Sequence, residues 1–359
     1  MGTLFRNPDV AKALRLLADG GPQVFYSGDI AKAILATERE LGGVMSAEDL
    51  KEFQPEWVEP VSTTYRGWKV YELPPNGQGM AALEMLNIME QFEPAKAGPL
   101  SVEEIHTRIE AMKLAYADLA RYNADPRFAK IPVAGLLSKG YAKERAALID
   151  ANKANCNPQA GIPPSSDTTY LTVVDRDGNI VSLIQSNFSS FGSGITVRGM
   201  GFALQNRGAL FMLDPTKPDA LAPRKRPFHT IIPAFMEHED DHIGFGIMGG
   251  ANQPLAHAQF VSNVVDYGMN LQAAMETARF TVRDNFDLGC KVLIEDRVPT
   301  EMRQKLSSMG HDLEVRGDYS LFMGRGQAID HNRKSGMNFA ASDARTDGAA
   351  VPEVPPGLR

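Results

Sequence analysis

The chain has 359 residues, of which 43% are hydrophobic and 23% charged, a composition typical of a globular protein with ample length for a large core. Length alone suggests about two domains. The formal net charge of −7 gives no electrostatic reason to expect nucleic acid or an anionic membrane as a partner, and no apolar run approaches the length of a membrane span. Small polar substrates remain compatible with this composition.

The sequence gives little sign of an exported protein. Residues 1–9 contain no basic stretch followed by an apolar one, so no signal peptide is predicted and a cytoplasmic location is slightly favoured. Cys156 and Cys290 lie far apart and match no zinc or redox spacing. We therefore predict two buried or unused thiols rather than a disulfide.

The first 150 residues predict mainly helices. One helix is expected from Pro8 to Leu17, and Ser101 with Glu104 forms a capping-box pattern that opens a longer one. Apolar residues of that longer helix recur at helical spacing and predict one core-facing stripe: Ile105, Ile109, Met112, Tyr116 and Leu119. The exception to this helical pattern is a predicted strand over residues 65–73, which is followed by a helix at about 80–91.

The second half predicts mainly strands. Residues 151–166 are rich in Asn, Pro, Gly and Ser and predict a loop. Beyond this loop, four strands are expected in two pairs, over residues 170–174 with 180–186 and over 231–236 with 242–248. Helices are then expected at about 252–267 and from 271 onward.

Thr168 follows the predicted loop directly and is a candidate nucleophile. A threonine hydroxyl needs a base beside it, and its own α-amino group can serve if the chain is cut before it. Cleavage between Asp167 and Thr168 would create an α-amino group with a pKa of about 7.7–8.0, close to the pH at which a general base works best. The competing interpretation is a threonine pair that simply begins a strand, since β-branched residues favour strands.

Several ordered motifs resemble those of the γ-glutamyltranspeptidase family of N-terminal-nucleophile hydrolases. The similarity extends over nearly the whole chain. Residues 25–28, 43–50, 65–67 and 71–75 are similar to the large-subunit half of that family, and residues 225–227, 249–250 and 341–345 are similar to its small subunit. The resemblance implies that the chain is cut before Thr168, with Thr169 supporting the environment of the nucleophile.

The resemblance also implies a fold. We expect an α/β (α+β) four-layer αββα sandwich, with a helix-rich large-subunit portion at 1–167 and a β-rich small subunit at 168–359. Both parts would belong to one intertwined fold and would remain associated after cleavage, with a homodimer as an option. Members of the family carry a further N-terminal stretch before the position that matches Met1, so the chain is expected to lack an N-terminal segment.

Three further positions match the catalytic machinery of the family. Ser186 stands where the family keeps a hydroxyl that hydrogen-bonds the nucleophile; the alternative is an ordinary strand serine. Gly249 and Gly250 match the glycines whose backbone N–H groups stabilise the developing oxyanion. No cofactor and no metal are expected.

Two other patterns invite different interpretations. Residues 244–249 satisfy the G-x-G-x-x-G dinucleotide pattern, but they lie inside a predicted strand instead of opening a helix. Residues 238–242 contain two histidines and three acidic residues, which we interpret as a solvated hairpin turn and not as a metal site.

The expected substrate pocket departs from that of γ-glutamyl enzymes. In the family register, Phe188, Arg207 and Leu210 replace the residues that hold the α-ammonium group of the substrate, and His229-Thr230 replaces a serine pair. Arginine suits an anion, which it can bind through two hydrogen bonds, although a structural carboxylate could also pair with it.

The sequence therefore predicts an autoprocessing amidohydrolase that acts on a γ-glutamyl or related dicarboxylic amide through an ester on Thr168. Water or an amine would then resolve the ester. The alternatives are an acylase of the cephalosporin or glutaryl type, favoured by Arg207 and Phe188, and a non-catalytic protein that is never cleaved.

Overall fold

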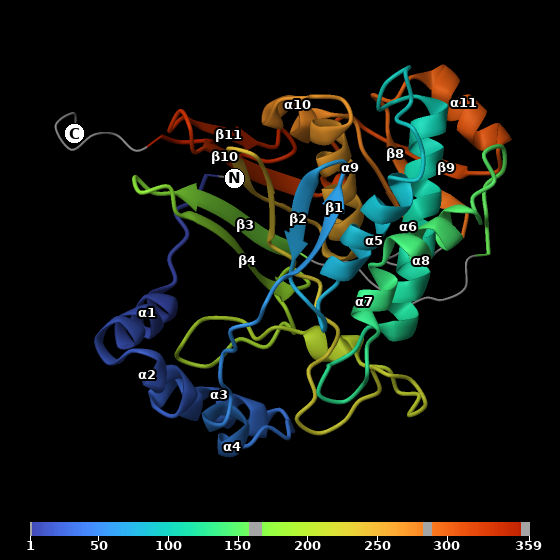
Figure 1. Cartoon of the computed structure of the whole chain (residues 1–359). Helices are drawn as coiled ribbons and strands as arrows, with labels where there is room; N and C mark the ends of the chain where they lie inside the picture. The colour runs from blue at the N-terminus through green and yellow to red at the C-terminus, as the bar shows by residue number, and fades with distance from the viewer. Residues whose placement is uncertain (1, 158–166, 283–288, 353–359) are drawn as a thin grey trace.

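The computed structural model describes residues 2–157, 167–282 and 289–352. The described residues form one mixed helix-and-sheet body (Figure 1), with the N-terminal helices at one end and the α6–α11 region at the other. Most of the loop predicted at 151–166 lies outside the described residues. Among the described residues, no helix is long and apolar enough to cross a membrane.

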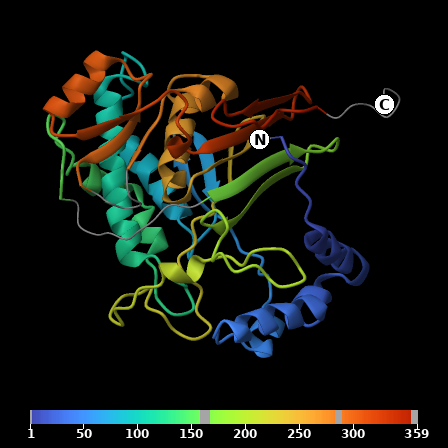
Figure 2. The ribbon, with the colours of Figure 1, turned by 180° about the vertical axis from the view of Figure 1, so that it is seen from behind.

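Four short helices begin the chain: α1 (Pro8–Gly20), α2 (Pro22–Tyr26), α3 (Asp29–Glu40) and α4 (Ala47–Lys51). Asn7 caps α1 by accepting a hydrogen bond from the backbone N–H of Val10, and its side chain also donates to the carbonyl of Gly201 at 2.9 Å. Ile30 and Ile34 pack with Val197 in a small second core. These contacts attach the N-terminal helices to the loop around residues 197–201. Figure 2, the view from behind, also shows these helices apart from α6 and α11.

The strand predicted at 65–73 is instead a hairpin of β1 (Val61–Tyr65) and β2 (Trp68–Glu72). Arg66 and Gly67 form its turn with φ angles of 47° and 90°. The sequence did not indicate this turn, because aromatic residues flank it and Gly67 is its only conventional turn residue.

A six-stranded sheet lies at the centre of the molecule, in the order β1-β2-β5-β6-β10-β11, and every neighbouring pair is antiparallel. The remaining strands of this sheet are β5 (Ala234–His238), β6 (Asp241–Met248), β10 (Arg325–Asn332) and β11 (Asn338–Ser342). The β5–β6 hairpin confirms the predicted turn at 238–242. Strand β5 starts at Ala234, three residues later than expected.

Three helices pack in the main core with the central sheet: α5 (Gly79–Met89), α6 (Val102–Tyr122) and α9 (Gln253–Val265). Ser101 caps α6, and every residue of the predicted apolar stripe is at most 2% exposed. Smaller elements surround this layer: α7 (Val133–Leu136), α8 (Lys139–Ala146), α10 (Leu271–Glu276), α11 (Thr300–Ser308) and a sheet of β7 (Phe280–Val282), β8 (Lys291–Glu295) and β9 (Asp312–Arg316).

The hairpin of β3 (Asp167–Val174) and β4 (Ile180–Phe188) packs on β6, across the central sheet from α9. Two glycines of β6 make this close approach possible. A Cβ at Gly246 would lie 2.4 Å from the ring of Tyr170, and one at Gly244 would lie 2.8 Å from the hydroxyl of Thr172. The G-x-G-x-x-G pattern therefore reflects packing between two sheets, as its place in a predicted strand indicated.

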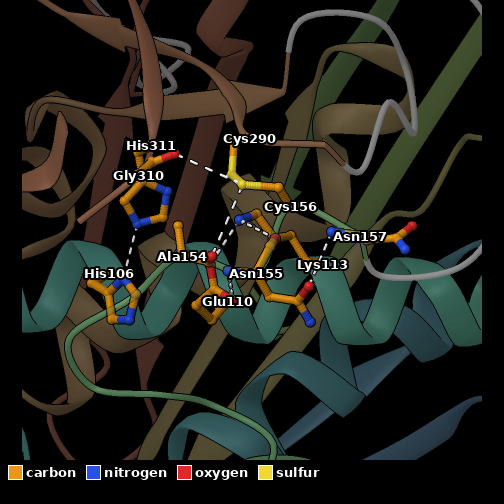
Figure 3. Close-up of a disulfide and its surroundings, with 10 residues drawn as sticks. All are labelled: His106, Glu110, Lys113, Ala154, Asn155, Cys156, Asn157, Cys290, Gly310 and His311. Atoms are coloured by element: carbon orange, nitrogen blue, oxygen red, sulfur yellow. Dashed lines mark hydrogen bonds and ion pairs between the residues drawn. A yellow bond between two sulfur atoms is a disulfide. The ribbon is translucent and has the colours of Figure 1, made fainter. Parts of the chain in front are cut away.

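Cys156 and Cys290 form a disulfide, so the prediction of two separate thiols was wrong. The loop after α8 brings Cys156 to the segment that leads into β8, with a Cα–Cα distance of 4.7 Å (Figure 3). Sequence spacing could not reveal this pair, because the two positions are 134 residues apart and meet only through tertiary packing.

Candidate active site

Thr168 and Ser186 face each other across the β3–β4 hairpin. The Thr168 hydroxyl donates a hydrogen bond to Ser186 Oγ at 3.1 Å, and Ser186 Oγ also accepts one from the backbone N–H of Phe188 at 2.8 Å. The Thr168 side chain is 7% exposed. The hydrogen-bond contact predicted between the two hydroxyls is present, while their catalytic roles stay predictions.

The packing register places Thr168 at the end of β6 that leads to Gly249. Thr172 lies over Gly244 and Tyr170 lies over Gly246. Side chains alternate along a strand, and the burial of Thr168 and Tyr170 on either side of exposed Thr169 puts Thr168 on that same face, next to a register shift between β3 and β4. The candidate nucleophile and the candidate oxyanion glycines therefore belong to one end of the paired sheets.

Gly249 and Gly250 form a tight turn between β6 and α9. Their φ angles are 147° and 61°, a conformation that glycine adopts without strain. A Cβ at Gly249 would lie 3.2 Å from the Cα of Gly324, so the turn is also closely packed. The oxyanion role of the two backbone N–H groups stays a prediction.

Arg207 is buried beside the hairpin, in the 3₁₀ turn Arg207–Leu210. Its guanidinium donates to the hydroxyl of Thr230 at 2.8 Å and lies 5.2 Å from the ring centroid of Phe188. No carboxylate of the described residues pairs with it, and its Nη2 has no hydrogen-bond partner among them. Burial lowers the pKa of Arg207 to about 10. The site therefore holds a desolvated cation with donor capacity to spare.

His229 adds a neutral group to the pocket. Burial, together with the nearby charges of Arg207 and Arg226, lowers the pKa of His229 to about 3. The imidazole is therefore uncharged near neutral pH. Its backbone N–H donates to the carbonyl of Asn76 at 3.0 Å, which attaches this segment to the loop before α5.

Thr169 lies on the opposite face of β3 from Thr168. Its side chain is exposed, whereas that of its neighbour Thr168 is buried. Consecutive residues of a strand point to opposite faces, so only one of the two threonines can face β6. The role predicted for Thr169 in supporting the nucleophile stays a prediction. Leu210, which replaces an acidic residue of γ-glutamyl enzymes in the family register, is buried in the same 3₁₀ turn as Arg207.

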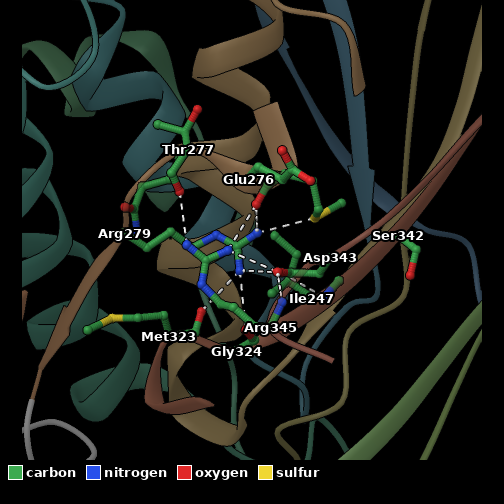
Figure 4. Close-up of polar contacts among 12 residues, drawn as sticks. Ile247, Glu276, Thr277, Arg279, Met323, Gly324, Ser342, Asp343 and Arg345 are labelled. Carbon is green, nitrogen blue, oxygen red and sulfur yellow. Dashed lines mark hydrogen bonds and ion pairs between the residues drawn. The ribbon is translucent and has the colours of Figure 1, made fainter. Parts of the chain in front are cut away.

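Two groups of residues near the site were missed by the sequence reasoning. Gln78 and Tyr116 hydrogen-bond to carbonyls of the Gly249–Gly250 turn and of the residue after it. Behind the turn, Arg279 donates to the carbonyl of Gly324 at 3.3 Å and pairs with Asp343, next to Arg345 (Figure 4). The only available signal was the family-like motif at 341–345, which gave no hint of its partners.

The chain was compared with known proteins. The sequence model of the gamma-glutamyltranspeptidase family matches residues 1–353. The fold superimposes on the crystal structure of cephalosporin acylase from Bacillus halodurans with a TM-score of 0.90, at 42% identity, over 97% of this chain and 63% of that one. The structure titled LmbA2991T421A gives a TM-score of 0.85 at 25% identity, over 96% of this chain and 68% of that one.

Among curated proteins, the glutathione hydrolase-like YwrD proenzyme of Bacillus subtilis is 38% identical over 352 residues, and the oxamate amidohydrolase proenzyme of Klebsiella pneumoniae is 33% identical over 352 residues. Each match covers 98% of this chain and 66% of the relative, so the chain spans about two thirds of their length. The match to the family over almost all residues, together with the shared fold, shows that the chain belongs to the gamma-glutamyltranspeptidase family of N-terminal-nucleophile hydrolases.

Proposed function

We propose that this chain is an autoprocessing amidohydrolase with Thr168 as its nucleophile, acting on amides of dicarboxylic acids. The observation that carries the proposal is the hydrogen bond from Thr168 Oγ1 to Ser186 Oγ in a buried setting. The similarity to proteins named proenzymes supports the processing step.

Processing would begin when Thr168 Oγ attacks the carbonyl carbon of Asp167. The peptide C–N bond breaks, the acyl group moves to oxygen as an ester, and the nitrogen becomes the free α-amino group of Thr168. Water then hydrolyses the ester and leaves a carboxyl group on Asp167. The new amine supplies the base that the hydroxyl lacked.

In turnover, the same hydroxyl would attack the amide carbonyl of the substrate. The α-amine takes the hydroxyl proton and passes it to the leaving amine, while the N–H groups of Gly249 and Gly250 stabilise the oxyanion. Water, or an acceptor amine, then resolves the acyl ester. Ser186 accepts the hydrogen bond of the nucleophile in the resting state and fixes its rotamer.

The acyl chain is proposed to end in a carboxylate bound by Arg207. A buried guanidinium with an unused Nη2 offers charge-assisted hydrogen bonds to an anion, and Thr230 already orients it. No acidic side chain of the described residues accompanies it to receive an α-ammonium group. A glutaryl-type amide thus fits the pocket better than a γ-glutamyl one.

Transfer or hydrolysis of γ-glutamyl groups is the second candidate. It is favoured by the match to the gamma-glutamyltranspeptidase family and by the 31% identity, over 364 residues, to a glutathione hydrolase proenzyme of Bacillus subtilis. This candidate requires the α-ammonium to be bound away from Arg207, since like charges in one desolvated pocket repel.

Self-cleavage is tested with the purified chain on denaturing reducing gels. We expect two fragments, with Thr168 at the new N-terminus, and one intact chain for Thr168→Ala, because the variant lacks the attacking oxygen. Thr169→Ala is the matched control, since its side chain is exposed on the other face of β3. An intact chain for Thr169→Ala combined with cleavage of Thr168→Ala would reject the nucleophile assignment.

The contact of Ser186 is tested by Ser186→Ala. We expect turnover to fall by roughly 10- to 100-fold, in the lower range for a group that orients a proton transfer. Ser182→Ala is the control on the same strand, because Ser182 bonds the Tyr170 hydroxyl at 2.8 Å and serves packing between the sheets. Equal rates for wild type and Ser186→Ala would remove Ser186 from the site.

A further inference from the structure

The Gly249–Gly250 turn is held by a buried side chain that no motif pointed to. Gln78 immediately precedes α5 and is fully buried. Its Nε2 donates two hydrogen bonds, to the carbonyl of Gly250 at 2.7 Å and to the carbonyl of Thr230 at 2.6 Å. One amide thus joins the candidate oxyanion turn to the segment that orients Arg207.

These bonds are not helix capping. Gln78 occupies the N-cap position of α5, yet its side chain makes no capping hydrogen bond to that helix. The loop before α5 runs beside the segment that contains His229 and Thr230, because Gly77 forms a parallel bridge with His229. The amide is therefore directed away from its own helix and toward the site.

A second donor holds the next carbonyl of the same turn. The hydroxyl of the buried residue Tyr116, on α6, donates to the carbonyl of Ala251 at 2.5 Å. Two glycines with positive φ angles impose little stiffness of their own, so hydrogen bonds from outside the turn help to fix its backbone. Gln78, just before α5, holds the peptide group between Gly250 and Ala251, and Tyr116 of α6 holds the next one, so both anchor the turn on the side that follows its glycines.

We propose that Gln78 is a positioning residue that sets the oxyanion turn relative to the acyl pocket, with Tyr116 as a weaker partner. This inference rests on the proposed function. Loss of both Gln78 hydrogen bonds would remove the link between the turn and Thr230 and leave the Gly250 carbonyl with the backbone N–H of Gln253 alone, so the turn could shift relative to the pocket. Preorganised donors act only at the correct distance from the developing charge, so kcat should fall more than KM changes.

The test uses Gln78→Met, which keeps the length of the side chain and removes both donors. We expect kcat of the cleaved enzyme to fall about tenfold to a hundredfold, below the loss typical of deleting an oxyanion donor outright. KM should change less than about threefold, because the binding of the ground state is retained. Tyr116→Phe should lower kcat by a smaller factor in the same direction and gives a milder variant if Gln78→Met folds poorly.

Gln259→Met is the matched control. Gln259 is also a buried amide, and its Nε2 also donates to two carbonyls, those of Leu255 and Phe280. It should lose thermal stability without a fall in kcat. An equal kcat loss in both glutamine variants, or a change in KM alone, would overturn the role of Gln78. Retained turnover in Thr168→Ala would instead show that the proposed function itself had failed.

A second inference comes from the disulfide. Cys156 precedes the proposed cut at 167/168 and Cys290 follows it, so the bond connects the two fragments that cleavage would create. The neighbouring backbone is docked as well (Figure 3). Lys113 of α6 donates to the carbonyl of Asn155 at 2.8 Å, and the N–H of Ala154 donates to the carbonyl of Met309 at 2.8 Å.

Most polar groups around this bond pair with one another or with the backbone, while His311 Nδ1 has no hydrogen-bond partner among the described residues. His106 Nε2 lies 2.8 Å from the carbonyl of Asp150 and must donate to it, so His106 Nδ1 accepts from His311 Nε2 at 2.8 Å. Glu110, the third residue of this potential metal-ligand cluster, accepts from Lys113 and from the N–H of Asn155. The cluster therefore serves as packing for the anchored segment.

We infer that Cys156–Cys290 makes the processed protein a covalently joined pair of fragments wherever its thiols are oxidised. This also rests on the proposed cleavage. A tether replaces free encounter by an effective concentration of about millimolar, so an unfolded pair can refold without a concentration-dependent step. Reduction would leave the fragments together only through non-covalent contacts.

Denaturing gels with and without reductant test this inference directly. We expect one band without reductant and two with it, while Cys156→Ser should give two bands under both conditions. Two bands from the wild type without reductant would overturn the tether, and one band under both conditions would show that cleavage does not occur. Refolding from urea should become dependent on protein concentration in Cys156→Ser only.

Discussion

Two buried arginines of this fold, Arg345 and Arg207, differ in the groups that pair with them. Arg345 is fully buried and pairs through two hydrogen bonds with Glu295, at 2.7 Å each, while it also pairs with Asp343 at 2.9 Å. Arg207 is equally enclosed, but its partner among the described residues is the hydroxyl of Thr230. One guanidinium is neutralised by the protein and the other is not.

This difference distinguishes a structural cation from one available to a ligand. Burial alone would raise the pKa of Asp343, but Arg279 and Arg345 outweigh that effect and lower it. At Arg207, burial acts without a compensating carboxylate and lowers the pKa of the guanidinium to about 10. An anion bound at Arg207 would offset the cost of burying an unpaired guanidinium. We therefore expect a substrate carboxylate to gain most of its binding energy at Arg207.

The largest effect should come from removing the structural arginine. Arg345→Met would leave Glu295 and Asp343 partly unpaired in a dry interior, and we expect the free energy of unfolding to fall by about 3–5 kcal/mol. Urea denaturation measures this change. Arg207→Met is the matched comparison and should cost less than about 1 kcal/mol, because it removes a buried charge without orphaning a carboxylate. Equal losses of unfolding free energy in the two variants would contradict the distinction between a structural arginine and one available to a ligand.

A moderate effect is expected on substrate choice. Arg207→Gln should narrow the preference for a glutaryl over a γ-glutamyl anilide by about tenfold in kcat/KM, which corresponds to about 1.4 kcal/mol. The reason is that the guanidinium attracts the terminal carboxylate and repels an α-ammonium, at about 4 kcal/mol for charges 4 Å apart at an effective dielectric of 20. If the wild type prefers the γ-glutamyl anilide by tenfold or more, Arg207 does not contact the acyl chain.

The last effect concerns pH and is absent near neutrality. The pKa of His229 is about 3 in the folded chain and is ordinarily 6.5, so between these values the unfolded chain binds a proton that the folded chain does not. Stability is therefore lost as the pH falls from 6.5 toward 3. His229→Asn should make this loss less steep in urea titrations at a series of pH values. His257 and His311 have pKa values lowered to about 3 as well, so the comparison with the wild type isolates His229.

Local patterns predicted much of this fold. The capping residue Ser101, the stripe on α6 and the strand pair β3–β4 depend on nearby residues, and each was found where expected. The β1–β2 turn was missed because aromatic residues flank it, and the disulfide was missed because its cysteines meet only in three dimensions.

The site divides in the same way. Thr168, Ser186 and the glycine turn could be placed from motifs, since they lie on two strands and one loop. The contacts of Gln78 and the partners of Arg345 could not, because a buried amide or ion pair is defined by what packs around it and leaves no periodic signal in the sequence. That no carboxylate of the described residues pairs with Arg207 is equally a property of the folded chain.

The β3–β4 hairpin, which carries Thr168 and Ser186, has an outer face that is only partly covered. Leu171, Val173, Val181 and Leu183 are 43–52% exposed, and β3 and β4 pair only with each other among the described strands. A two-stranded ribbon supported on one side opens more easily than a central sheet. We therefore expect amide hydrogens of this hairpin to exchange with solvent well before those of β6. On warming, the arrangement around Thr168 would loosen while the helical signal in circular dichroism still looked native.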